Sequence, residues 1–240
     1  MILQSSTKLS TNYSLRLIYL VIGIILFIGL GKPSNAQITE GQKAISESAL
    51  SLLGKKSLKF PGKSFPWDCS GVVLASLWLA GLDVSKEYGA SSGNGVNRLH
   101  EIAVRHQIEY DLLLPEVGDI IFWDNTYDKN EDLLWNDLLT HTGIVVAVSN
   151  DGTITYVHHD YRRGIIAAEM NLFHADDRTA IQLGGAAKLI NSPMRMDKDR
   201  YLNPSRWLSS HLFRSFGRFH MLLDDTEAKQ SVALIPKPKH

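Results

Sequence analysis

Only one cysteine, Cys69, occurs among the 240 residues, so the chain can form no internal disulfide. The sequence also lacks internal repeats and any basic stretch with interleaved aromatic residues, which argues against a repeat protein and against nucleic acid as a partner. Neither charge sign dominates, because 25 Lys and Arg residues oppose 25 Asp and Glu residues. The length suits one sizeable domain with extensions.

Acidic residues are absent from residues 1–36, which hold three basic residues and a 15-residue apolar run at residues 17–31. The small residues Ser34 and Ala36 follow this run. The order is typical of a secretory signal peptide, whereas a membrane-spanning helix needs about 20 apolar residues. We therefore expect residues 1–36 to be a signal peptide, the protein to be exported (periplasm, cell envelope or secreted), and no stable membrane partner after cleavage. A retained N-terminal anchor is the alternative.

The segment around Cys69 predicts a buried helix that starts at the cysteine. Asp68 is a good N-cap residue, Gly81 is a good residue just past the helix end, and most residues between are apolar. A thiol in the first turn lies at the positive end of the helix dipole, which favours the thiolate. A lone thiol in an exported protein is a candidate reactive group, and a small core residue is the alternative interpretation.

Hydrophobic periodicity divides the remaining chain into helices followed by strands. Helices are expected at residues 39–53, 69–80 and 96–107, a loop at 55–66, and strands at 120–123, 141–148, 154–158 and 164–172. We expect one domain at residues 37–224, with a C-terminal extension from about residue 173, and a flexible tail at 225–240. The extension carries Trp207, Phe213, Phe216 and Phe219, which we expect to pack against the sheet.

Asn150-Asp151-Gly152 is a strong hairpin signal between two of these strands. With a loop of two or four residues, His158 lies opposite Val145 or Gly143 and shares a face with His141. His159 then points to the other face. A loop of odd length would reverse this assignment.

A cysteine nucleophile needs an imidazole as proton acceptor and donor, and that imidazole needs a polar partner to orient it. Cys69, His141 and His158 fit these three roles. Each histidine taken singly is more often a surface or structural residue. A histidine-rich metal site formed by His141, His158, His159 and Asp160 is a minor option.

Asp68-Cys69-Ser70-Gly71-Val72-Val73 resembles the Asp-Cys-Ser-Gly-hydrophobic signature of NlpC-like cell-wall peptidases. Gly118-Asp119-Ile120-Ile121-Phe122, His141-Thr142-Gly143-Ile144 and Tyr156-Val157-His158 are similar to their following motifs, in the same order. The resemblance covers residues 67–158. The long hairpin with Asn-Asp-Gly-Thr-Ile-Thr is more similar to the related CHAP branch, the cysteine, histidine-dependent amidohydrolases/peptidases.

The resemblance implies a papain-like α+β fold, with N-terminal helices and the cysteine helix packed on a central antiparallel sheet. It implies hydrolysis of amide bonds in peptidoglycan peptides by a Cys69-His141-His158 triad, without a cofactor, in a monomer. The backbone N–H of Cys69 and one further donor would meet the oxyanion. We assign Trp67, Ser70 and Phe60 to substrate binding and Asp119 to a structural turn.

Two departures from the family pattern leave alternatives open. Relatives often carry a tyrosine upstream of the cysteine, where Phe60 is the nearest aromatic residue here. An insert at residues 124–137 contains Asp128, Asn130 and Asp132, which alternate like the start of a calcium loop. Leu133 and Leu139 stand where that loop needs Gly and Glu, so a solvated acidic loop is the main interpretation.

Two functions of other classes remain as alternatives to a cell-wall hydrolase. A catalytically weak relative would bind wall peptides without cutting them, and the change near Phe60 motivates this hypothesis. A lipid acyltransferase or thioesterase is the second alternative, but such relatives usually place the histidine before the cysteine, opposite to the order of Cys69 and His141.

Overall fold

Helix α2 (Glu40–Ser51) opens the part of the chain that the structure describes, which is residues 38–223 of a computed structural model. The predicted signal peptide and tail lie outside the described residues. The helix begins with a capping box in which Thr39 accepts from the backbone N–H of Gln42 and Gln42 accepts from that of Thr39. No helix within residues 38–223 is long and apolar enough to cross a membrane.

A central sheet of six antiparallel strands follows the helices in sequence, in the spatial order β3-β10-β4-β5-β6-β7. Its strands are β3 (Glu109–Tyr110), β4 (Ile120–Trp123), β5 (His141–Val148), β6 (Ile154–Asp160), β7 (Gly164–Met170) and β10 (Phe213–Gly217). The strands expected at 120–123, 141–148, 154–158 and 164–172 are all present, with β6 two residues longer and β7 two shorter. The predicted α+β fold, with helices beside an antiparallel sheet, is confirmed.

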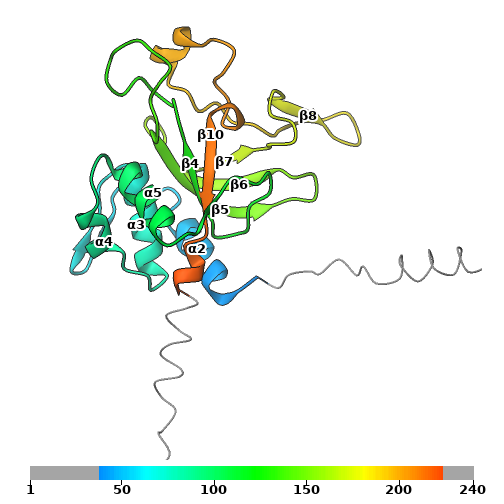
Figure 1. Ribbon diagram of the computed structural model, residues 1–240. Helices are drawn as coiled ribbons and strands as arrows, with labels where there is room; N and C mark the ends of the chain where they lie inside the picture. Colours follow the sequence, from blue (N-terminus) through cyan, green and yellow to red (C-terminus); the bar gives the residue numbers. More distant parts are fainter. Residues whose placement is uncertain (1–37, 224–240) are drawn as a thin grey trace, which may run out of the picture. The chain divides into compact units, whose positions relative to one another are not determined.

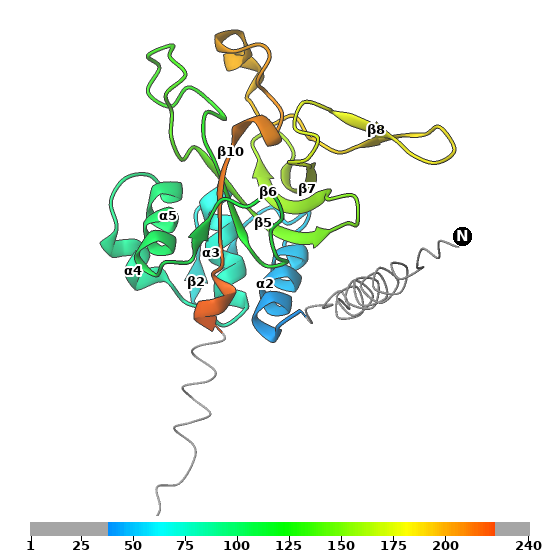
Figure 2. The same cartoon turned by 45° about the vertical axis from the view of Figure 1, so that its right-hand side comes forward.

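The helices lie on one side of this sheet, as Figures 1 and 2 show. They are α2, α3 (Cys69–Leu79), α4 (Ser85–Ala90) and α5 (Gly95–Arg105). Val72 and Leu77 of α3 join Ile144 and Val157 of the sheet in one buried apolar cluster. The opposite face carries a second cluster, which includes Trp123. Both faces of the sheet are therefore covered, and α3 is fixed against β5 and β6.

The region after residue 173 does more than pack against the sheet. Its last strand, β10, inserts between β3 and β4, and Phe216 and Phe219 are fully buried. Trp207 and Phe213 are only partly buried. The region also forms the hairpin β8 (Thr179–Ile181) and β9 (Ala187–Leu189) and the short helices η1 (Asp197–Leu202) and η2 (Ser210–Leu212). The extension therefore completes the sheet of the same domain.

Short elements lie where the sequence predicts none. The expected loop at 55–66 contains a small ladder of β1 (Lys59–Phe60) and β2 (Lys63–Ser64), and α4 precedes α5. A two-residue strand or a six-residue helix carries too little periodicity to be seen in a sequence.

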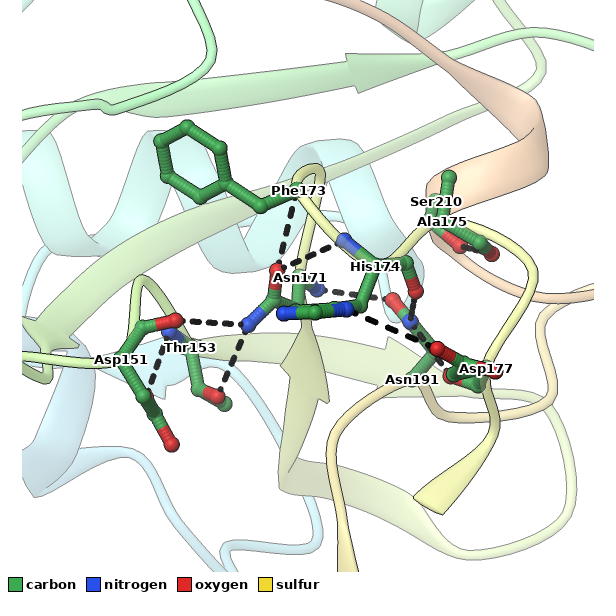
Figure 3. Close-up of polar contacts among 9 residues, drawn as sticks. All are labelled: Asp151, Thr153, Asn171, Phe173, His174, Ala175, Asp177, Asn191 and Ser210. Atoms are coloured by element: carbon green, nitrogen blue, oxygen red, sulfur yellow. Dashed lines mark hydrogen bonds and ion pairs between the residues drawn. The ribbon is translucent and has the colours of Figure 1, made fainter. Parts of the chain in front are cut away.

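Two buried asparagines fasten the extension to the β5–β6 hairpin (Figure 3). The Asn171 side chain donates to the carbonyl oxygen of Asp151 and accepts from the backbone N–H groups of Phe173 and His174. Asn191 accepts from the backbone N–H of Asn171 at 2.7 Å. These bonds fix the start of the extension, and residues 193–197, which follow Asn191, line the cavity of the candidate site.

Candidate active site

Helix α3 presents Cys69 in its first turn because Asp68 caps the helix. The Asp68 side chain accepts from the backbone N–H of Gly71 and from the Ser70 hydroxyl, each at 2.8 Å. A Cβ added to Gly71 would lie 1.8 Å from the carbonyl oxygen of Pro66. Gly71 therefore lets the loop before Cys69 pass close to the helix, which a side chain would prevent.

The two predicted histidines meet on one face of the sheet. The Nε2 atom of His141 lies 2.8 Å from the Nδ1 atom of His158. The loop between the paired residues Val148 and Ile154 has odd length, which alone would have reversed the face of His158. A bulge between Val145 and Ala147 adds one residue on β5 and restores the parity. The prediction that His141 and His158 share a face of the sheet is thus confirmed. The odd loop length and the bulge each shift the side-chain alternation by one residue, and the two shifts cancel.

Gly143 makes room for this pair of rings. A Cβ at Gly143 would lie 3.0 Å from the carbonyl oxygen of Val157 and 3.3 Å from both the His158 Cβ and the Trp123 ring. The glycine lies two residues after His141 on the same strand face. Its missing side chain leaves the space in which His158 approaches His141.

Cys69, His141 and His158 all line one cavity of about 520 Å³. Besides these three, its walls come from the start of α3 and α5, the insert, the β6–β7 turn and the extension, with the residues Asp68, Ser70, Asn94, Gly95, Val96, Thr126, Tyr127, Thr140, His159, Asp160, Tyr161, Arg162, Arg163, Pro193, Met194, Arg195, Met196 and Asp197. A substrate in this cavity would meet the sulfur and the histidine pair together.

The structure separates the three residues assigned to substrate binding. Ser70 lines the cavity, where its hydroxyl is bonded to Asp68. Trp67 is 42% exposed and packs edge-on against His159, and it is outside the cavity lining. Phe60 also lies outside the lining, in an aromatic cluster with Phe65 and Trp78. Of the three, only Ser70 is placed to contact a molecule in the cavity.

The Cys69 thiol is neutral at rest. Burial, and then the neighbouring charge of Asp68, raise its pKa to about 12, against the opposite pull of backbone N–H groups that include Thr142. The position of Cys69 at the helix start predicts a stabilised thiolate, but desolvation outweighs the effect of the helix dipole here. Within the described part of the chain no hydrogen bond joins the Cys69 sulfur to His141. The thiol therefore depends on a base to remove its proton.

Both histidines of the pair are neutral at pH 7. Burial is the main cause that lowers the pKa of His141 to about 4, and the charge of His159 adds to it. Burial, and then the charge of His141, lower the pKa of His158 well below its ordinary value. A neutral imidazole has one donor and one acceptor nitrogen, so a single proton lies between His141 and His158.

The acidic insert is held together by bonds within the loop. Asp132 accepts from Asn130, Asn136 and the backbone N–H of Leu134, while the buried Asp128 accepts from that of Leu133. Within residues 38–223 no group of three or more His, Cys, Asp or Glu is arranged to hold a metal ion. Neither the candidate calcium loop in the insert nor the histidine-rich cluster with His159 and Asp160 therefore forms such a group within residues 38–223.

Several residues that line the cavity were not singled out from the sequence. Tyr127 comes from the insert, and Arg195 and Met196 come from the extension. The position of Tyr127 shortly before His141 is the only local signal that could have suggested it. The extension residues reach the cavity through long-range packing that no nearby motif indicates.

A helix-borne cysteine beside two strand-borne histidines, on an antiparallel sheet, is the arrangement of a papain-like cysteine hydrolase. Residues 60–160 match the family model described as the CHAP domain, so this segment belongs to that family. The CHAP domain indicates a hydrolase of peptidoglycan, amidase or peptidase, generally of the cysteine type. No curated protein matches the chain. No solved structure matches it either.

Proposed function

We propose that this protein is an exported cysteine peptidase or amidase that cuts amide bonds in peptidoglycan peptides with Cys69, His141 and His158. The observation that carries the proposal is the 2.8 Å bond between the two histidines in the wall of the cavity that Cys69 lines. Export rests on the signal-like residues 1–36.

The first step joins the sulfur to the substrate. Since the Nε2 atom of His141 is bonded to His158, its Nδ1 atom is the nitrogen left to take the thiol proton. The sulfur attacks the carbonyl carbon, a C–S bond forms, and the electron pair of the carbonyl bond moves to its oxygen. The backbone N–H of Cys69, at the helix start, is placed to donate to that oxygen.

The second step releases the amine and then the acid. When the carbonyl reforms, the C–N bond breaks and the imidazolium of His141 gives its proton to the leaving amine. Water, deprotonated by His141, then attacks the thioester carbon, the C–S bond breaks, and the departing sulfur takes the proton from the imidazolium of His141 to become the free thiol again. His158 orients His141 throughout, because its neutral Nδ1 atom accepts the Nε2–H bond.

A catalytically weak, peptide-binding protein is the second candidate function. The raised pKa of Cys69, to about 12, favours it, because a neutral thiol is a poor nucleophile without efficient proton removal. The fold and cavity serve both candidates equally, so only an assay of product separates them.

Purified protein lacking residues 1–36 is incubated with peptidoglycan fragments, and new amino and carboxyl ends are identified by mass spectrometry. The proposal expects peptide products with the unaltered residues and none above background with Cys69→Ala or His141→Ala. Binding of fragments without products in any sample would establish the second candidate instead. Products that persist in Cys69→Ala would exclude a cysteine mechanism.

A further inference from the structure

Tyr127 lines the cavity, although it lies in the insert after β4 and is distant in sequence from helix α3. The residue is half-buried and lines the same cavity as Cys69. Its hydroxyl makes no hydrogen bond to any residue in the range 38–223. It is therefore a donor that a molecule in the cavity can use.

The backbone on both sides of Tyr127 is fixed. Thr126 donates to the Thr140 hydroxyl at 2.9 Å and accepts from the backbone N–H of Met196 at 2.8 Å. Asp128 donates from its backbone N–H to the buried Asp199 at 3.1 Å. Thr140 directly precedes His141, so the anchors that place the tyrosine also adjoin the proposed base. A ring held this way needs little reorganisation when a substrate binds.

Several other side-chain donors of the cavity are already engaged. The amide of Asn94 donates to the carbonyl oxygen of Leu139, and the Ser70 hydroxyl donates to Asp68. The Thr140 hydroxyl is bonded to Trp123 and Thr126. Arg162 and Arg163 are paired with aspartates of the cavity wall. The Tyr127 phenol has no such bond within residues 38–223, and the same holds for the Nε2 atom of His159, one nitrogen of Arg195 and the exposed Tyr161 hydroxyl. Tyr127 differs from Tyr161 in being half-buried.

We propose that the Tyr127 hydroxyl donates a hydrogen bond to the substrate carbonyl oxygen as Cys69 attacks, as the second oxyanion donor beside the backbone N–H of Cys69. This role rests on the proposed function. In the step, the C–S bond forms and the carbonyl electron pair moves to oxygen, where the phenol O–H stabilises it without giving up its proton.

The electrostatic surroundings of Tyr127 suit a donor that stays protonated. Burial, then the negative charge that Cys69 carries once it is deprotonated, then Asp137 and Asp68 raise the pKa of the Tyr127 hydroxyl. The hydroxyl-bearing Tyr127 and Cys69 line the same cavity, and this geometry carries the proposal. The phenol therefore keeps its proton, and its hydrogen bond to the substrate oxygen strengthens because that oxygen becomes negatively charged.

Two reagents separate this role from a structural one. Acylation by p-nitrophenyl acetate passes through an oxyanion, whereas alkylation by iodoacetamide uses the same sulfur without one. Both rates are measured at one pH for the unaltered protein, Tyr127→Phe, and Tyr201→Phe as a matched control. Tyr201 is 61% exposed and lies outside the cavity lining. Cys69→Ala supplies the background.

The proposal expects Tyr127→Phe to lower the acylation rate about 10- to 100-fold while alkylation stays within about twofold. Tyr201→Phe should leave both rates within about twofold of those of the unaltered protein. Unchanged acylation in Tyr127→Phe, or an equal fall of both rates, would overturn the role of Tyr127 and leave the proposed function standing. If acylation of the unaltered protein does not exceed that of Cys69→Ala, the proposed nucleophile fails, and this inference with it.

Discussion

His141 and His158 share a hydrogen bond of 2.8 Å between Nε2 of the first ring and Nδ1 of the second. For Nδ1 of His141 to act as a base, its Nε2 atom must carry the ring proton and donate it to His158. A protonated His158 could not accept this bond. Burial keeps His158 neutral by lowering its pKa well below the ordinary value, which would let this histidine orient the proposed base.

Replacing His158 should therefore affect catalysis in proportion to the acceptor that remains. We expect His158→Ala to lower kcat about 100-fold or more, with little change in KM, because the wrong tautomer of His141 becomes accessible. In His158→Asn the side-chain oxygen offers an acceptor, so a substantial part of kcat should return. Steady-state kinetics on a peptidoglycan fragment measures both. Equal losses in the two variants would show that His158 does not act through this bond.

The resting thiol predicts a distinctive pH profile of alkylation. Because the pKa of Cys69 is raised to about 12 and that of His141 is lowered to about 4, no thiolate–imidazolium pair exists between these values at rest. The rate of iodoacetamide labelling should rise steadily from pH 6 to pH 10. A plateau that already begins near pH 5 would reveal a preformed ion pair and contradict the neutral resting state.

Acidification should destabilise the fold through the same histidines. In the unfolded chain a histidine binds its proton near pH 6.5, whereas the folded pKa values of His141 and His158 are lower. Between these limits the unfolded state binds more protons, so the free energy of unfolding falls as the pH drops, by at most about 1.4 kcal/mol per pH unit for each group.

His158→Asn removes one of these groups. The loss of unfolding free energy between pH 7 and pH 5 should be smaller in this variant, by up to about 2 kcal/mol, than in the unaltered protein. Urea denaturation at the two pH values measures the difference. An equal loss in both proteins would mean that His158 is not kept neutral by the fold.

Gly71 should be intolerant of a side chain. A Cβ there would lie 1.8 Å from the carbonyl oxygen of Pro66, so Gly71→Ala must displace the loop before Cys69. We expect a loss of about 2 kcal/mol or more in unfolding free energy and a large loss of activity. Gly89→Ala is the matched control, because nothing lies within 4 Å of its added Cβ in helix α4. Similar stability of both variants would contradict the contact.

The hydrogen bonds of Asn171 should contribute measurably to the stability of the fold. Asn171 is 1% exposed, and its side chain bonds both to the β5–β6 hairpin and to the extension. Asn171→Ala leaves several buried polar groups unpaired, which should cost about 1–3 kcal/mol of unfolding free energy. The exposed Asn150 lies in the same hairpin turn, and Asn150→Ala should stay within about 0.5 kcal/mol. Thermal denaturation compares the stability of the two variants. Equal effects would show that the hydrogen bonds of Asn171 do not stabilise the fold.

Local signals in the sequence were sufficient for the cysteine helix. Asp68, Cys69 and the apolar residues that follow determine the cap, the burial and the start of α3, as the structure has them. The strands at 120–123 and 141–148 follow from equally local patterns. The raised pKa of the thiol did not follow, because desolvation depends on what the whole fold places around Cys69.

His141 and His158 share the face that the hairpin pattern predicts, but for a reason that the pattern contains only in part. The hairpin signal favours loops of two or four residues, and neither the five-residue span after Val148 nor the bulge beside Val146 has a signature in the residues themselves. Bulges depend on the twist and packing of the finished sheet. Tyr127 and the strand β10 likewise reach their places through contacts far along the chain, which spacing alone cannot predict.

The central claim is that Cys69 becomes covalently joined to a peptide from the cell wall. Protein lacking residues 1–36 is mixed with a peptidoglycan fragment, quenched in acid within a turnover, and analysed by intact-mass and peptide-mapping mass spectrometry. We predict an added mass equal to the acyl part of the cut peptide, located on Cys69 and absent from Cys69→Ala. Cleavage of the fragment with no adduct on Cys69, and at an undiminished rate in Cys69→Ala, would contradict the account.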